Sequence, residues 1–223
     1  DNRPIWWRCR KPTQPPHLRR KDTMLYRPKD LSPPPALPWA SFAHADRYPF
    51  TQQEVVAQWH RLHAGDAEPL PQDPAVLQAW ALFHSGRFAE AERAGLAAGG
   101  AGLTVANKAA IIHAYYLEPS EALRLSRFST AAERAAQQAQ SDPGNANAWF
   151  WHAYALGRYS QGISVAKALA QGLGLRVRDT LQRVITLSPR HADARLALGA
   201  FHAEVIDKVG DLVAQMTDRK SVV

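Results

Sequence analysis

Pro143-Gly-Asn-Ala-Asn-Ala-Trp149 has a counterpart further along the chain in Pro189-Arg-His-Ala-Asp-Ala-Arg195. Each stretch holds a proline, two further residues and an alanine, and each leads into an apolar run with helical spacing. Proline ends a helix because it lacks the N–H donor and its ring clashes with the preceding turn. Both stretches therefore predict a joint between two helices, and their recurrence predicts an array of similar helical units.

These joints resemble those between tetratricopeptide repeats, in which proline closes one helical hairpin and the next hairpin begins three residues later. Leu198-Gly199 fits the same pattern, and Gly86-Arg-Phe88-Ala-Glu-Ala91 resembles the turn inside a repeat. The resemblance spans residues 75–213 and implies an all-α fold, in which antiparallel helical hairpins stack as a right-handed solenoid. Over residues 145–213 the chain is also similar to the regulator-of-microtubule-dynamics group of tetratricopeptide proteins.

The resemblance implies about three hairpins and part of a fourth, a count that rests mainly on Pro143, Trp149, Pro189, Leu198 and Gly199. The expected helices span residues 51–65, 75–85, 88–98, 104–117, 120–140, 145–158 and 175–187, with a further helix after Pro189. The interval from Pro143 to Pro189 is longer than an ordinary repeat, and the excess falls in residues 159–174. We therefore expect an added turn or short helix there, bounded by Gly162 and Gly172.

The net charge of +7 belongs to the N-terminal end of the chain. Residues 1–29 contain nine Lys or Arg against two Asp, whereas the rest of the chain carries eighteen residues of each sign. A basic face that could contact phosphates is therefore not expected on the folded part, and nucleic acid is not expected to bind there. A nucleic-acid role of the basic end itself stays open as an alternative.

Residues 1–45 are expected to form a proline-rich, basic and disordered or non-native tail, and residues 46–217 the helical domain. Nine of the sixteen prolines lie in residues 1–38, and Met24 is an alternative start. Neither start is followed by a signal peptide, and no apolar run approaches the about 18 residues of a membrane span, so we expect a cytoplasmic protein without a transmembrane segment.

The last six residues, 218–223, resemble the translation of a common sequencing-adapter stretch. This resemblance predicts that the segment is an artefact, that the natural protein continues beyond Thr217 and that the present sequence is a fragment.

The sequence contains no recognisable catalytic or cofactor motif. The single cysteine, Cys9, excludes an internal disulfide and a multi-cysteine zinc site. His60 and His63 share one side of a helix but lack the glutamate of a zinc-binding helix motif, and no phosphate-binding glycine loop occurs. We therefore expect no cofactor, no metal and no enzymatic activity. The alternative is a helical enzyme or metal-binding protein whose active residues lie in a missing C-terminal part.

The resemblance implies a non-catalytic scaffold that binds another protein or a peptide of unknown identity in a concave groove. First-helix positions assign eight residues to this groove, namely Asn147, Phe150, Tyr154, Arg158, Asp193, Leu196, Ala200 and Glu204. Its aromatic residues suit an amphipathic helix or an extended apolar peptide, with Arg158 and Glu204 setting the polarity. The alternative is that Phe150 and Tyr154 fill the core, or that the inserted segment covers them.

Overall fold

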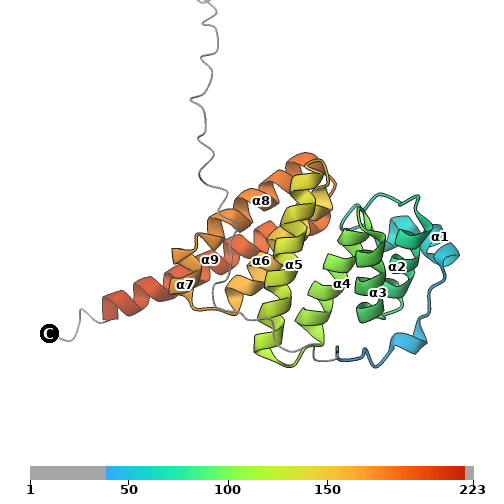
Figure 1. Cartoon of the computed structure of the whole chain (residues 1–223). Coiled ribbons are helices and arrows are strands. Elements are labelled where there is room, and N and C mark those ends of the chain that lie inside the picture. Colours follow the sequence, from blue (N-terminus) through green and yellow to red (C-terminus); the bar gives the residue numbers. More distant parts are fainter. Residues whose placement is uncertain (1–38, 219–223) are drawn as a thin grey trace, which may run out of the picture.

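The structure, a computed structural model, describes residues 39–218 (Figure 1). Within these residues the chain forms α-helices and a short 3₁₀ helix, Ala45–Arg47, and it contains no β-strand, so the predicted all-α class is confirmed there. The α-helices are α1 (Gln52–Leu62), α2 (Pro74–His84), α3 (Phe88–Ala98), α4 (Gly102–Tyr116), α5 (Glu121–Ser141), α6 (Ala146–Gln161), α7 (Val165–Ala170), α8 (Leu173–Leu187) and α9 (Ala192–Asp218). Residues 1–38 of the predicted tail and residues 219–223 of the predicted artefact lie outside the described residues.

Side-chain caps explain where several helices begin. Thr51 accepts a hydrogen bond from the backbone N–H of Glu54, and the Glu54 carboxylate accepts one from the backbone N–H of Thr51, which together form a capping box. Asp73, Ser120, Asn145 and Ser164 cap α2, α5, α6 and α7 in the same way, each accepting from a backbone N–H. These local signals are the reason that the helix starts could be predicted from sequence.

The helices pack in the order of the chain. Each helix from α1 to α6 contacts the next one, α6 then contacts α8, and α8 contacts α9. A second series of contacts joins α2 to α4, α4 to α6, and α6 to α9, so these four helices lie beside one another in succession (Figure 1). The side chains of this series position the candidate site described below.

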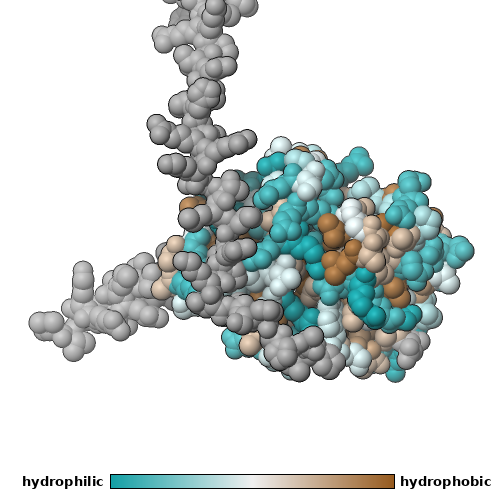
Figure 2. All heavy atoms as spheres, in the orientation of Figure 1, coloured by the Kyte–Doolittle hydropathy of each residue, from teal (hydrophilic) through white to brown (hydrophobic). Residues whose placement is uncertain are grey.

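Small residues let the helices approach closely. Ala131, Ala135 and Ala139 of α5 are buried, and their small side chains permit a short distance to the neighbouring helices. Larger side chains fill two cores, one around Trp59 and Trp80 and the other around Phe150 and other residues of α6 and α8. On the face shown in Figure 2, hydrophilic residues cover much of the described surface and strongly hydrophobic ones are confined to small patches.

Residues 39–45, which the composition assigns to the tail, contact the helices. The Trp39 ring lies 4.5 Å from the His113 ring and 4.3 Å from the Arg127 guanidinium, measured between centres. His113 Nε2 lies 2.9 Å from the carbonyl oxygen of Ala40, and the Phe42 ring packs on Phe88. The aromatic side chains of this stretch therefore dock it against α3, α4 and α5.

The closest approach of α3 and α4 depends on Gly95. A Cβ at this position would lie 2.5 Å from the carbonyl oxygen of Gly102, which is a backbone atom that side-chain rotation cannot move away. We expect Gly95→Ala to lower the free energy of unfolding in urea by about 1–3 kcal/mol, the usual cost of overpacking. Gly199→Ala is the control, because a Cβ there meets nothing within 4 Å. It should stabilise α9 by up to about 1 kcal/mol; equal effects of the two changes would contradict the close-packing argument.

Candidate partner-binding groove and pocket

The structure divides the eight predicted groove residues into two groups. Asn147, Phe150 and Asp193 lie near a buried polar cluster, formed by His63, Asp66, Glu68, His84, Lys108, Asn147 and His191. Tyr154, Arg158, Ala200 and Glu204 line an apolar pocket further along the same helices. Leu196 is 72% exposed on α9 and does not line that pocket.

The loop between α1 and α2 occupies the first part of the predicted groove. Asn147 Nδ2 donates to the carbonyl oxygen of Asp66 at 3.0 Å and to the Glu68 carboxyl group at 2.6 Å. The backbone N–H of Asp193 donates to the carbonyl oxygen of Gly65 at 3.0 Å. A Cβ on Gly65 would lie 2.4 Å from the Asp193 carboxylate, so the absence of a side chain permits this approach. The chain itself thus fills the part of the groove where Asn147 and Asp193 were expected to meet a partner.

An ion pair holds the centre of the polar cluster. Lys108 Nζ of α4 lies 2.6 Å from one oxygen of Asp66, and His63 Nδ1 lies 2.9 Å from the other. Asp66 is only 2% exposed, and burial disfavours its charged form. The hydrogen bond from His63 and the positive charge of Lys108 outweigh that burial and hold the pKa of Asp66 well below its usual range.

Aromatic rings surround the Lys108 ammonium group. Its Nζ lies 5.3 Å from the ring centroids of Trp80 and Phe83 and 5.5 Å from that of Trp151. Glu68, which is also buried, behaves differently from Asp66, because burial and the negative charge of Asp66 raise the pKa of Glu68 to about 8. Near neutral pH the cluster therefore holds one ion pair and a protonated Glu68.

The three histidines of the cluster are neutral and act as hydrogen-bonding groups. Because His63 donates from Nδ1 to Asp66, its Nε2 accepts from Nε2 of His84, 3.3 Å away. His191 Nε2 donates to Asn147 Oδ1 at 3.0 Å, while its Nδ1 accepts from the backbone N–H of Ala194. Burial lowers the pKa of His63, that of His84 to about 3 and that of His191 to about 4. Among residues 39–218 no three His, Cys, Asp or Glu side chains are grouped to hold a metal ion.

The polar cluster links parts of the chain inside the protein. Groups with strongly shifted pKa values gather at catalytic sites when they face a cleft, but structural networks shift pKa values as well. Here His63, Asp66 and Asn147 are almost fully buried, they bond to one another or to the loop, and none of them lines the pocket. The geometry supports a role in joining the α1–α2 loop to α4, α6 and α9.

Phe150 lies in the core. It is 2% exposed, and its ring centroid lies 4.9 Å from that of Trp151 and 4.6 Å from that of His191. Phe150 therefore fills the core, which is the alternative that the sequence analysis gives for this residue. Truncating such a side chain to alanine costs about 3–5 kcal/mol of stability, so a Phe150 variant would report on folding before it reported on binding.

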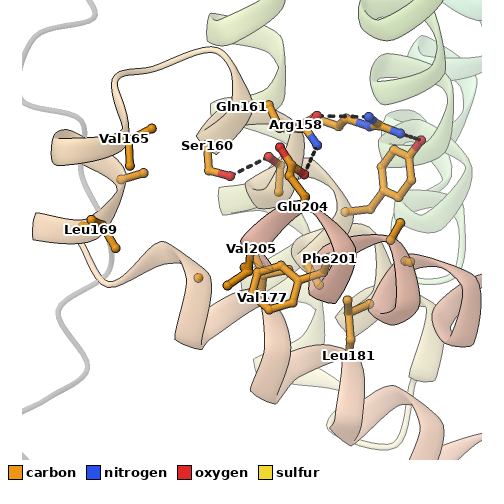
Figure 3. Close-up of a pocket in the computed structure, with 17 residues that line it drawn as sticks. Arg158, Ser160, Gln161, Val165, Leu169, Val177, Leu181, Phe201, Glu204 and Val205 are labelled. Carbon is orange, nitrogen blue, oxygen red and sulfur yellow. Dashed lines mark hydrogen bonds between the residues drawn. The ribbon is translucent and has the colours of Figure 1, made fainter. Parts of the chain in front are cut away.

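The pocket lies between α6, α7, α8 and α9 and encloses about 230 Å³ (Figure 3). Val177 and Leu181 of α8 line it together with Phe201 and Val205 of α9, which point toward them in Figure 3. Most of its lining is aliphatic or aromatic, as is usual for sites that take an apolar ligand group. The pocket thus has an apolar interior, and four of the eight predicted groove residues line it.

Helix α7 forms one wall of the pocket and lies where the sequence predicts an added turn or short helix. None of its residues is buried, and Leu169, which lines the pocket, is 69% exposed. After α7 the chain turns at Gly172, whose φ of +62° lies in the left-handed region that favours glycine. The insertion therefore places apolar side chains beside the pocket without burying them.

A chain of hydrogen bonds forms the polar rim of the pocket (Figure 3). Arg158 donates at 3.0 Å to the Tyr154 hydroxyl and at 3.0 Å to Gln161 Oε1, and Gln161 Nε2 donates to the Glu204 carboxylate at 2.7 Å. The Arg158 guanidinium also lies 4.0 Å from the centroid of the Tyr115 ring. The rim therefore fixes a positive group on α6 and a negative group on α9, with an amide between them.

Comparisons with protein-family models, curated proteins and solved structures give no match for this chain. Its assignment to the tetratricopeptide class thus stays a proposal. Across the described part of the chain, no helix combines the length and the apolar character that crossing a membrane requires.

The raised pKa of Glu68 predicts a pH dependence of stability that Glu68→Gln removes. The folded state keeps a proton on Glu68 up to about pH 8, whereas a glutamate in the unfolded chain has its ordinary pKa of 4.5. Stability contributed by this group therefore falls as pH rises from 5 to 8. Urea unfolding across this range should show the Gln variant gaining stability relative to the parent protein. The histidines titrate in both proteins and cancel in the difference, so a difference that is independent of pH would contradict the assignment.

The ion pair predicts strong coupling between Asp66 and Lys108. Lys108→Met leaves a buried carboxylate without its cation and should lower the free energy of unfolding by about 3–5 kcal/mol. Asp66→Asn combined with Lys108→Met removes both charges and should be less destabilising than the sum of the single changes. A double-mutant cycle measures the coupling, and strict additivity would show that the pair is not an interacting unit.

Proposed function

We propose that this protein is a non-catalytic scaffold of the tetratricopeptide type and that it binds another protein or a peptide in the pocket between α6, α7, α8 and α9. The proline joints at Pro143 and Pro189 support the class, as do the contacts of each helix with the next one. The succession of α2, α4, α6 and α9 also agrees with it, because stacked hairpins bring their first helices side by side.

The exposed apolar lining of the pocket is the observation that carries this proposal. Leu169 of α7 and Val205 of α9 both line the pocket, and both are more than a third exposed. Apolar side chains that border an apolar cavity gain free energy when a partner covers them, at about 25 cal/mol per Å² of apolar surface removed from water. The polar rim next to them supplies directional contacts, which binding sites need for specificity.

The self-bound loop limits where a partner could lie. Asn147 already bonds to Asp66 and Glu68, and Asp193 already contacts Gly65. A partner at that end would have to displace buried and hydrogen-bonded groups, whose exposure is costly. At the pocket end, Tyr154, Arg158, Ala200 and Glu204 border an open cavity. The four residues that line the pocket are therefore the part of the predicted groove that we assign to partner binding.

Selection of peptides on the full chain tests the proposal. A phage-displayed library of random peptides is panned on the protein, and the affinity of the selected peptides is measured for Leu169→Ser and Leu175→Ser. Both leucines are exposed, at 69% and 61%, but only Leu169 lines the pocket. We expect Leu169→Ser to weaken binding about tenfold, equivalent to about 1.4 kcal/mol, and Leu175→Ser to leave it unchanged. Absence of any binder, or equal losses in both variants, would reject the pocket as the binding site.

A further inference from the structure

We propose that the pocket selects an amphipathic helix of a partner protein that carries an acidic residue beside its apolar anchors, and that this carboxylate pairs with Arg158. The inference rests on the proposed function and names the chemistry of the partner. It rests on three observations, which are the contacts of Arg158, the charges near the pocket and the small residues that line the pocket.

Arg158 is held in place and keeps donors available. Its guanidinium group stacks on the ring of Tyr115 and donates one hydrogen bond to Tyr154 and one to Gln161. A guanidinium has five N–H donors, so these two bonds leave others for a further acceptor. None of the ion pairs between described residues involves Arg158. A fixed arginine at the rim of an apolar pocket is suited to a carboxylate, because its planar fork matches the two carboxylate oxygens.

The rim keeps Arg158 apart from the neighbouring carboxylate. Glu204 accepts a hydrogen bond from Gln161, and Gln161 in turn accepts one from Arg158, so the amide stands between the two charges. A carboxylate from a partner would therefore meet the α6 side of the rim, where the positive group lies (Figure 3).

Positive groups lie on two neighbouring helices at the pocket. The pocket lining contains one positive residue, Arg158 of α6, and one negative residue, Glu204 of α9. Lys167 of α7 lies beside pocket residues Val165, Ala168 and Leu169, and it is exposed. Arg158 and Lys167 thus place two positive groups on α6 and α7, which favours the approach of an acidic segment on that side of the pocket.

The small residues of the pocket favour a helix as the occupant. Ala153 and Gly157 of α6 face the pocket together with Ala197 and Ala200 of α9. Helices pack with their axes about 8–10 Å apart, and the shorter separations require small side chains at the contact. Phe201 and Val205 provide an apolar surface on α9 for anchors spaced one turn apart on the partner. An acidic residue that flanks those anchors would then reach the rim.

Charge-swapped peptides test the inference with the full chain. Two fluorescein-labelled helical peptides share the same leucine face and differ only in the flanking positions, which hold Glu in one and Lys in the other. Fluorescence anisotropy should show the Glu peptide binding at least tenfold tighter to the parent protein. Arg158→Glu should reverse this preference, and Arg158→Gln should abolish it. Arg195→Glu is the matched control, since Arg195 is exposed on α9, does not line the pocket and bonds to the carbonyl oxygen of Pro189; it should keep the preference for Glu.

The outcomes separate this inference from the proposed function. Equal binding of both peptides, with no response to Arg158→Glu, overturns the acidic preference, while a loss in Leu169→Ser would still support binding of proteins at the pocket. If Arg158→Glu unfolds, as circular dichroism would show, Arg158→Gln alone decides the matter. Binding of a fluorescent fatty acid that Leu169→Ser weakens, without binding of either peptide, overturns the inference in favour of a lipid ligand.

Discussion

The ion pair between Asp66 and Lys108 is the interaction on which much of the arrangement depends. Burying two charges is costly, and here the cost is offset by a short contact, a hydrogen bond from His63 and the aromatic rings around Lys108. The pair joins the α1–α2 loop to α4. From there, bonds to Asn147 and to the backbone of Asp193 extend the connection to α6 and α9. A single loop thus links the first helix to the last.

This link makes the stability of the helical array depend on a contact between its two ends. In stacked repeats each unit contacts only its neighbours, so stability is close to a sum of local terms. The contact between Gly65 and Asp193 joins segments that are far apart in the sequence, so separating the α1–α2 loop from α9 breaks it. Helices α6 and α9 each have two parts with different contacts. Their N-terminal parts bind the α1–α2 loop, and their later parts line the pocket.

Local features were predictable from the sequence, and long-range ones were not. The helices follow from proline joints, from caps such as Thr51 and from alanines at contact positions, all of which act within a few residues. Asp66 and Glu68 lie in a segment with the composition of an exposed polar loop, and only their distant partners explain why these two side chains are buried. Phe150 occupies a predicted groove position, yet whether it faces a partner or the core depends on where that loop lies. The eight predicted groove residues lie on α6 and α9, and their division into two groups needed the structure.

The pocket includes the segment between α6 and α8, which is longer than the expected tetratricopeptide pattern allows. Residues of α6, α8 and α9 line the pocket on several sides, and the extra segment adds α7, whose Val165 and Leu169 line it as well. Arg158 lies in the last turn of α6, immediately before the insertion, where a positive charge also compensates the helix dipole. The extra segment therefore supplies one apolar wall of the pocket and directly follows the arginine at its rim, so the proposed binding site lies where the sequence departs from the expected repeat length.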